Sequence, residues 1–181
     1  MDLDRFSNVS LPDADGTTRR LGDFWAEKPV VVVFARHFGC LHCREHAADL
    51  RDVYDDVRAR GGEIVAIGTG DVGYAKHFVS EDQIPYPVLV DDHAEAARAA
   101  LVKRVPFFAL FNPKTFAATR DARKRGFRIH KPGKRVTQLG ATFVLGPGPA
   151  VRYEHIDQTT VDHASLDEVL AALPGAEAPA R

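Results

Sequence analysis

The only two cysteines of this 181-residue chain, Cys40 and Cys43, lie three residues apart in the stretch VVVVFARHFGCLHCREHAADL. At this spacing two thiols can reach each other across one helical turn, so that one thiolate attacks a substrate and the other resolves the intermediate. An apolar run of strand length precedes them and a helical pattern follows. A helix that begins here presents unpaired N–H groups, which lower a thiol pKa from its usual value of about 8.5. The pattern therefore predicts a reactive thiol pair.

The neighbouring side chains favour the same chemistry. Histidines and arginines crowd the pair, and a positive charge within about 4–6 Å stabilises a thiolate. We expect such support from four side chains, namely Arg36, His37, His42 and Arg44. Helix physics favours Cys40 as the attacking sulfur, because a sulfur at the helix N-cap lies nearest to the free N–H groups.

Two other interpretations compete with redox chemistry. The cysteines could be structural core residues, but His42 and Arg44 are poor neighbours for an apolar pocket. They could also bind zinc together with two of the imidazoles of His37, His42 and His46, since CxxC is a familiar half-site. Structural zinc usually takes its second ligand pair from a distant stretch, and no second Cys/His cluster occurs in the sequence. We favour redox chemistry and keep zinc binding as an alternative.

The elements around the pair predict an α/β fold. Hydrophobic patterns predict strands over residues 29–35, 63–70, 86–92, 140–148 and 150–157, and helices over 43–62, 71–83, 93–102 and 165–175. Right-handed crossovers make the early strands parallel, and the Gly146–Pro147–Gly148 turn makes the last two antiparallel. The expected fold is a mixed central sheet with helices on both faces, and Trp25 is expected to pack the N-terminal segment against it.

Composition and charge indicate one globular domain, which we place at residues 1–175, with a disordered tail at 176–181. The net charge is −1, yet residues 103–136, the basic insertion, hold eleven Lys/Arg and one acid, so they carry +10 and the rest −11. We expect a solvated helical excursion that VPFFALFN anchors to the body. Its alternative role is to bind an acidic partner or the chain's own acidic face. Nucleic acid is not favoured, because no aromatic side chain other than Phe127 is interleaved with the cations of residues 120–135.

The N-terminus lacks the apolar region of a secretory signal, and no apolar run approaches the ~18 residues of a membrane span. We therefore predict no membrane partner and a cytoplasmic, reducing location. A CxxC pair there is catalytic, redox-sensing or metal-binding more often than a permanent staple.

Three segments resemble the peroxiredoxin-like AhpC/TSA antioxidant family of the thioredoxin-like superfamily. They are the cysteine stretch at 30–50, QLGATFVLGP, and AVRYEHIDQTTVDHASLDEVLAAL. With LPDADGTTRRLGDFW, the resemblance covers most of residues 9–174. It implies a thioredoxin-like three-layer fold and thiol-dependent reduction of hydroperoxides or oxidised thiols. It also implies that no prosthetic group is needed, that thioredoxin or glutathione supplies electrons, and that a homodimer can form.

The sequence departs from the family at positions that matter for mechanism. Typical members carry P-x-x-x-T-x-x-C; with Cys43 as the final cysteine, Arg36 and Cys40 replace the Pro and Thr that orient the hydroperoxide. In a thioredoxin alignment Cys40 attacks, Ala141 falls near the cis-proline position, and Thr142 could contact the sulfur or substrate. The attacking thiol thus stays open, with Cys43 favoured for peroxide and Cys40 for disulfide exchange. The alternative functions are a thiol–disulfide oxidoreductase and a redox-gated interaction module without peroxidase turnover.

Overall fold

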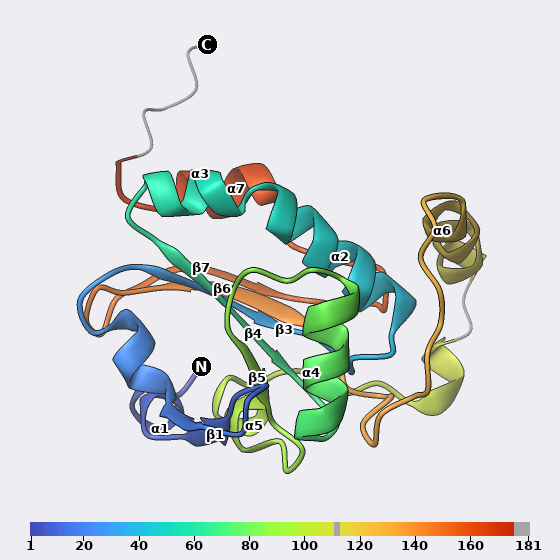
Figure 1. The fold of residues 1–181 in the computed structure, drawn as a ribbon, viewed down its shortest axis with the longest axis horizontal. Coiled ribbons are helices and arrows are strands. Elements are labelled where there is room, and N and C mark those ends of the chain that lie inside the picture. Colours follow the sequence, from blue (N-terminus) through green and yellow to red (C-terminus); the bar gives the residue numbers. More distant parts are fainter. Residues whose placement is uncertain (111–112, 176–181) are drawn as a thin grey trace.

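A five-stranded mixed sheet forms the centre of the computed structural model, which describes residues 1–110 and 113–175 (Figure 1). The strands run in the order β5-β4-β3-β6-β7, and they span Val88–Val90, Glu63–Gly68, Val30–Phe34, Ala141–Leu145 and Val151–Ile156. β3, β4 and β5 pair in parallel, whereas β6 pairs antiparallel with both β3 and β7. The predicted mixed sheet is confirmed.

Helices cover both faces of this sheet, so the three-layer α/β architecture is also confirmed. One face packs against α2 (Leu41–Asp52), α3 (Tyr54–Ala59), α4 (Val72–Glu81) and α7 (Leu166–Ala171). The other packs against α1 (Leu3–Ser7), the 3₁₀ helix η1 (Leu21–Trp25) and α5 (Glu95–Ala99). A hairpin of β1 (Ser10–Pro12) and β2 (Thr18–Arg20) lies beside this second group.

The central strand β3 shows why the sequence folds this way. Its five residues are all buried, and they alternate between the two cores: Val31 and Val33 join the core under α2, while Val30, Val32 and Phe34 join the opposite core. A continuous β-branched run suits a strand that is covered on both faces. β3 is the central strand of the sheet. The residues that follow it therefore lie at the carboxyl ends of the parallel strands, where open α/β folds place their sites.

Some elements differ in detail from the predicted ones. The helix expected over 43–62 is two helices, because Val53 departs from helical geometry (φ −104°, ψ 8°) between α2 and α3. The N-terminal region adds α1, which the sequence patterns do not reveal. Trp25 is buried and stacks on Phe6 with 5.4 Å between the ring centres, so it fixes the N-terminal segment as expected.

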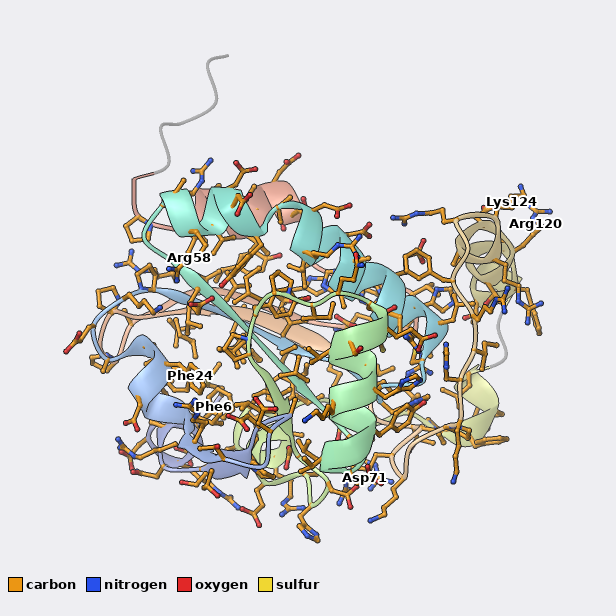
Figure 2. The ribbon with its side chains drawn as sticks, in the orientation of Figure 1. Phe6, Phe24, Arg58, Asp71, Arg120 and Lys124 are labelled. Atoms are coloured by element: carbon orange, nitrogen blue, oxygen red, sulfur yellow. The ribbon has the colours of Figure 1, made fainter. Side chains whose placement is uncertain are left out.

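The basic insertion contains the 3₁₀ helix η2 (Phe107–Leu110) and α6 (Pro113–Lys124), which Figure 1 shows set apart from the sheet. The prediction that VPFFALFN anchors it is wrong for the two phenylalanines that the structure describes there, because Phe107 and Phe108 are 62% and 75% exposed. Other contacts hold the insertion: Arg125 binds Glu45 at 2.6 Å and Asp49 at 2.5 Å on α2, and Ala122 of α6 is fully buried. Arg120 and Lys124 project outward from α6 (Figure 2).

Residues 111 and 112 and the tail 176–181, for which we predict disorder, lie outside the described residues. No helix in the described part of the chain has the length and apolar character that crossing a bilayer requires.

Candidate active site

Cys40 lies where the chain leaves β3 and enters α2, and it is the N-cap of that helix. Its backbone is extended (φ −74°, ψ 121°), and its carbonyl accepts the first helical hydrogen bond, from the Arg44 N–H at 3.0 Å. The Cys40 Sγ accepts a hydrogen bond from the Cys43 N–H at 3.4 Å. A sulfur therefore takes the place that a Ser or Asp side chain often occupies at a helix start. The N-cap position expected from the sequence is confirmed.

Arg36 joins the two sulfurs. Its Nη2 donates to the Cys40 Sγ at 3.0 Å, and its backbone N–H donates to the Cys43 Sγ at 3.3 Å. The Arg36 carbonyl accepts from the Thr69 hydroxyl at 2.9 Å, which fixes the loop to the end of β4. One buried arginine thus supplies a charged donor to one sulfur and a neutral donor to the other.

This geometry separates the two thiols electrostatically. A hydrogen bond from the Cys43 thiol holds the pKa of Cys40 well below its usual value, and the charge of Arg36 acts in the same direction against the effect of burial. The same hydrogen bond raises the pKa of Cys43, as do burial and the adjacent Cys40 charge. Protein thiols of this kind titrate as a pair, and here the pair favours a Cys40 thiolate beside a Cys43 thiol.

Both sulfurs are nearly enclosed. Cys40 is 6% exposed and Cys43 is 9% exposed, and the structure has them as free thiols. Their surroundings are not purely hydrocarbon, because Arg36, His37 and His42 are buried around them. A small oxidant could approach through a limited opening, whereas a large substrate would need the loop to move.

The two predicted histidines differ in their surroundings. His37 is buried with its Nδ1 unpartnered, and burial lowers its pKa even though the nearby Cys40 acts in the opposite direction. His42 lies toward the insertion: its Nε2 is 3.0 Å from the Thr119 hydroxyl on α6, and its Nδ1 is 3.6 Å from Glu45. Burial lowers the pKa of His42 as well, so a neutral imidazole is favoured at both positions.

The structure does not place Arg44 and Thr142 where the sequence analysis expects them to act. The Arg44 guanidinium is buried in ion pairs with Glu81 at 2.6 Å and Asp82 at 2.7 Å, so its charge is directed toward α4. Thr142 is buried in β6 opposite Val33, and no hydrogen bond joins its hydroxyl to either sulfur among the described residues. Helical spacing alone does not reveal which way a long side chain extends, so the sequence does not indicate that Arg44 pairs with Glu81 and Asp82 and not with a sulfur.

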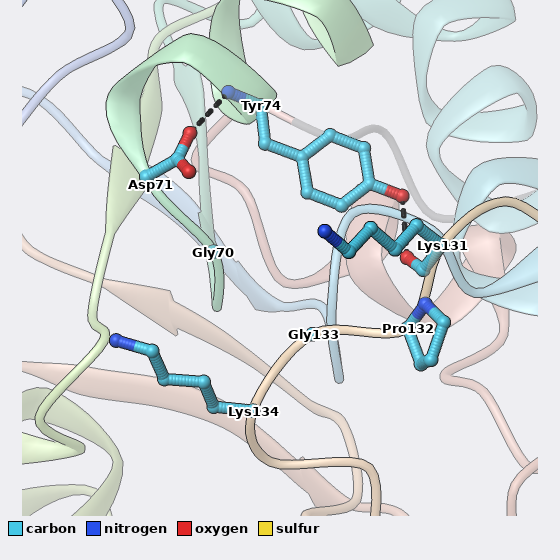
Figure 3. A pocket seen from close by; sticks show the side chains of 7 residues that line it. All are labelled: Gly70, Asp71, Tyr74, Lys131, Pro132, Gly133 and Lys134. Atoms are coloured by element: carbon cyan, nitrogen blue, oxygen red, sulfur yellow. Dashed lines mark hydrogen bonds between the residues drawn. The ribbon is translucent and has the colours of Figure 1, made fainter.

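The end of the basic insertion covers the cysteine loop, which the sequence did not indicate. The His130 N–H donates to the Gly39 carbonyl at 3.0 Å, and the Tyr74 hydroxyl donates to the Lys131 carbonyl at 2.7 Å (Figure 3). A Cβ on Gly39 would clash with both the Lys131 carbonyl and the Tyr74 hydroxyl, so only glycine allows this close approach. A pocket of about 420 Å³ adjoins the contact, lined by Gly70, Asp71, Tyr74 and residues 131–134.

A second buried polar group lies near α2. The rings of His46 and His163 stack at 4.5 Å, and the His163 Nδ1 lies 3.3 Å from the buried carboxylate of Asp157. Burial raises the pKa of Asp157 and, together with the neighbouring histidines His163 and His155, lowers that of His46. The spacings H-x-D at 155–157 and D-H at 162–163 were the available sequence signal for this cluster.

The zinc alternative gains no support from the geometry. Within residues 1–110 and 113–175, the only group of three His, Cys, Asp or Glu side chains with ligand atoms close enough for one ion is His77, Glu81 and His130. His37, His42 and His46 therefore do not complete a metal cluster with the two sulfurs.

Comparisons with known proteins identify the family of the chain. A model of the AhpC/TSA family matches residues 3–153. The chain belongs to the AhpC/TSA family. Thioredoxin-like protein AAED1, chloroplastic, of Arabidopsis thaliana is 30% identical over 182 residues, which cover 93% of this chain and 71% of the relative. Peroxiredoxin-like 2C of Mus musculus is 25% identical over 176 residues, covering 90% of this chain and 76% of the relative.

Solved structures of AhpC/TSA-type proteins share the fold. Peroxidoxin BcpB of Mycobacterium tuberculosis superposes with a TM-score of 0.68 at 24% identity, covering 91% of this chain and 90% of that one. The bacterioferritin comigratory protein of Xanthomonas campestris gives a TM-score of 0.69 at 19% identity, covering 94% and 92%. The fold is thioredoxin-like, as expected. As a member of the AhpC/TSA family, the protein is an enzyme of peroxiredoxin-like type, a thiol peroxidase or thiol–disulfide oxidoreductase.

Proposed function

We propose that the protein reduces small hydroperoxides by a dithiol cycle in which Cys40 attacks and Cys43 resolves. The observation that carries the proposal is that the two sulfurs accept hydrogen bonds from different kinds of donor. Cys40 receives the charged Arg36 donor at 3.0 Å and lies at the start of α2, whereas Cys43 receives a neutral backbone N–H. The thiolate is the reactive form of a cysteine, so the sulfur with the lower pKa reacts first.

In the first step the Cys40 thiolate attacks the terminal oxygen of ROOH. The O–O bond breaks, ROH leaves with uptake of one proton, and Cys40 becomes a sulfenic acid. This step neutralises the Cys40 charge, which is one of the causes that raise the pKa of Cys43. Cys43 can then ionise beside the Arg36 N–H and attack the Cys40 sulfur, which forms the disulfide and releases water.

Two equivalents of an external thiol return the disulfide to the dithiol and are themselves oxidised to a disulfide. We propose thioredoxin or glutathione as this reductant, no prosthetic group, and a cytoplasmic location, where such thiols are kept reduced. The enclosure of both sulfurs supports a small peroxide as oxidant and a loop movement before the reductant can reach the disulfide.

Peroxide consumption with a thiol reductant tests the assignment in wild type, Cys40→Ser and Cys43→Ser. We expect Cys40→Ser to lose turnover and to form no sulfenic acid. Cys43→Ser should consume about one equivalent of peroxide, form a sulfenic acid that dimedone traps, and then stop or continue slowly with added thiol. A sulfenic acid on Cys43 in the Cys40→Ser variant, at the wild-type rate, would reverse the assignment.

Thiol–disulfide exchange without peroxidase turnover is the second candidate. When Cys43 is aligned with the family's peroxidatic cysteine, Arg36 and Cys40 stand where the family's Pro and Thr orient the hydroperoxide, and the absence of that pair favours this alternative. An exchange enzyme would reduce a mixed disulfide or insulin with Cys40 as nucleophile, yet consume peroxide no faster than free thiols of equal pKa. The same three proteins, assayed with a disulfide substrate, distinguish the two candidates.

A further inference from the structure

Three potential ligands converge beside the redox site, on the surface between α4 and the insertion. His77 and Glu81 lie four residues apart on α4, and His130 comes from residues 126–135, which we name the returning segment. The His77 Nε2 is 3.1 Å from the Glu81 Oε2, and the His130 Nε2 is 3.7 Å from the Glu81 Oε1. All three ligand atoms lie within 4.8 Å of one another.

These separations suit a shared metal ion. Zinc bonds of about 2.0–2.2 Å to nitrogen and oxygen place two ligand atoms of one tetrahedral ion roughly 3.3–3.5 Å apart. The His77 Nε2 is 3.1 Å from one carboxylate oxygen of Glu81 and the His130 Nε2 is 3.7 Å from the other, so each imidazole lies near this separation from the carboxylate. Two imidazoles and one carboxylate form a donor set typical of Zn²⁺, in which water occupies the open position. A pocket of about 400 Å³ that borders Glu81 and His130 leaves room for that water.

Two of the three ligands are held in place by other contacts. Arg44 donates to the Glu81 Oε2 at 2.6 Å, and this hydrogen bond orients the carboxylate while Oε1 remains directed toward His130. Hydrogen-bonded outer partners of this kind fix the ligands of metal sites. His130 is positioned by its own N–H, which donates to the Gly39 carbonyl at 3.0 Å.

We propose that His77, Glu81 and His130 bind a divalent transition-metal ion, Zn²⁺ by their donor set, and that the ion fastens the returning segment to α4. The site is separate from the cysteines and does not depend on which of them attacks. Because His130 also contacts Gly39, the residue before Cys40, the bound ion stabilises the cover over the redox loop.

Zinc titration by calorimetry tests this in the full chain carrying Cys40→Ser and Cys43→Ser, which removes both thiolates as competing ligands. We expect one Zn²⁺ per chain. His77→Gln and His130→Gln, each in that background, should weaken binding by at least about 10–100-fold, the loss that follows mutation of even an outer partner of a metal ligand. His93→Gln alters an exposed histidine outside the cluster and should bind like its parent.

A second measurement uses wild-type protein and Co²⁺, which reports the ligand type. Coordination by imidazole and carboxylate lacks the intense near-ultraviolet sulfur-to-cobalt band that thiolates produce. At one equivalent we expect the visible spectrum of bound Co²⁺ without that sulfur band. This spectrum should disappear in His77→Gln and stay unchanged in His93→Gln. A strong sulfur band at one equivalent, no saturable zinc binding up to millimolar concentration, or equal affinity in His77→Gln and its parent would each overturn the proposal.

Discussion

The loop before Cys40 and the basic insertion both present aromatic and cationic side chains, but they use them in opposite ways. In the loop, Phe38 is buried and stacks on Phe78 at 5.4 Å, while the Arg36 guanidinium is bound to a sulfur. In the insertion, Phe108 and Phe116 are exposed. The same residue types therefore build a rigid reactive centre in one region and a surface in the other.

The difference shows which forces position each region. The loop is fixed by burial, because its aromatic ring fills the space beside Gly68 and Gly70 and its cation is neutralised within the protein. The insertion is held by Arg125 on α2 and by backbone contacts of the returning segment. Part of the acidic partner expected for the insertion is therefore the chain's own α2.

The largest contrast should appear when one aromatic ring is removed from each region. Phe38→Ala deletes a fully buried ring, which typically costs about 3–5 kcal/mol of unfolding free energy. Phe108→Ala removes an exposed ring and should change that free energy by no more than about 0.5 kcal/mol. Urea unfolding of the reduced proteins measures both. Equal losses in the two variants would show that the insertion packs as tightly as the loop.

The next effect concerns the cation of the loop. Arg36→Gln removes a hydrogen bond to a charged group, worth about 1.5–3 kcal/mol, so the thiolate reaction near neutral pH should slow by about 10–100-fold. Since the pKa of Cys40 is depressed in the wild type, its peroxide rate should rise with pH and level off at a lower pH than the rate of an ordinary thiol does. In the variant that rise should move to higher pH, and Arg36→Lys should restore it in part.

Stopped-flow peroxide kinetics across pH measures this shift, and thiolate absorbance gives the pKa independently. Arg58→Gln is the matched control, because Arg58 pairs with Glu63 at the far end of the sheet. A profile in Arg36→Gln that matches the wild type would remove Arg36 from the mechanism.

The sequence predicts the sheet and the start of a helix at Cys40 well, for a physical reason. β3 is apolar on every residue, and the helix after it has a clear buried stripe, so local patterns define both elements. Their junction places Cys40 at the helix start by geometry alone. The break at Val53 and the short α1 carry no comparable periodic signal, because tertiary packing decides them.

The partners of the long side chains could not be predicted in the same way. Arg36 and Arg44 are each four residues from Cys40, yet one binds its sulfur and the other binds Glu81 and Asp82. That choice depends on α4, which is distant in sequence. Residues 130–133 cover the cysteine loop through contacts with Gly39 and Tyr74, which are also distant in sequence.

A smaller effect is expected where the two regions meet, at Gly39. Gly39→Ala introduces a Cβ against the Lys131 carbonyl and the Tyr74 hydroxyl, and overpacking of this kind typically costs about 1–3 kcal/mol. Because the cover is displaced, Cys40 should also be alkylated faster at a given pH. Gly73→Ala lies within α4, where a Cβ meets only the Asp71 side chain, and alanine favours a helix.

Unfolding midpoints and iodoacetamide rates of the Gly39→Ala and Gly73→Ala variants complete this test. If the two variants react at the same rate, the returning segment does not restrict access to Cys40.

The smallest effect should come from the ion pairs that hold the insertion. Arg125 is half exposed and binds Glu45 and Asp49, and exposed pairs of this kind contribute about 0.2–1 kcal/mol. Arg125→Ala should therefore lower the unfolding free energy by no more than about that amount, and the difference should shrink in 1 M salt because screening weakens the wild-type pairs. Arg120→Ala, which removes a charge that points away from α2, is the control. A loss that persists in high salt would mean that Arg125 acts through contacts other than its ion pairs, such as the contact of its guanidinium carbon with the Phe127 ring, whose centre lies 5.3 Å away.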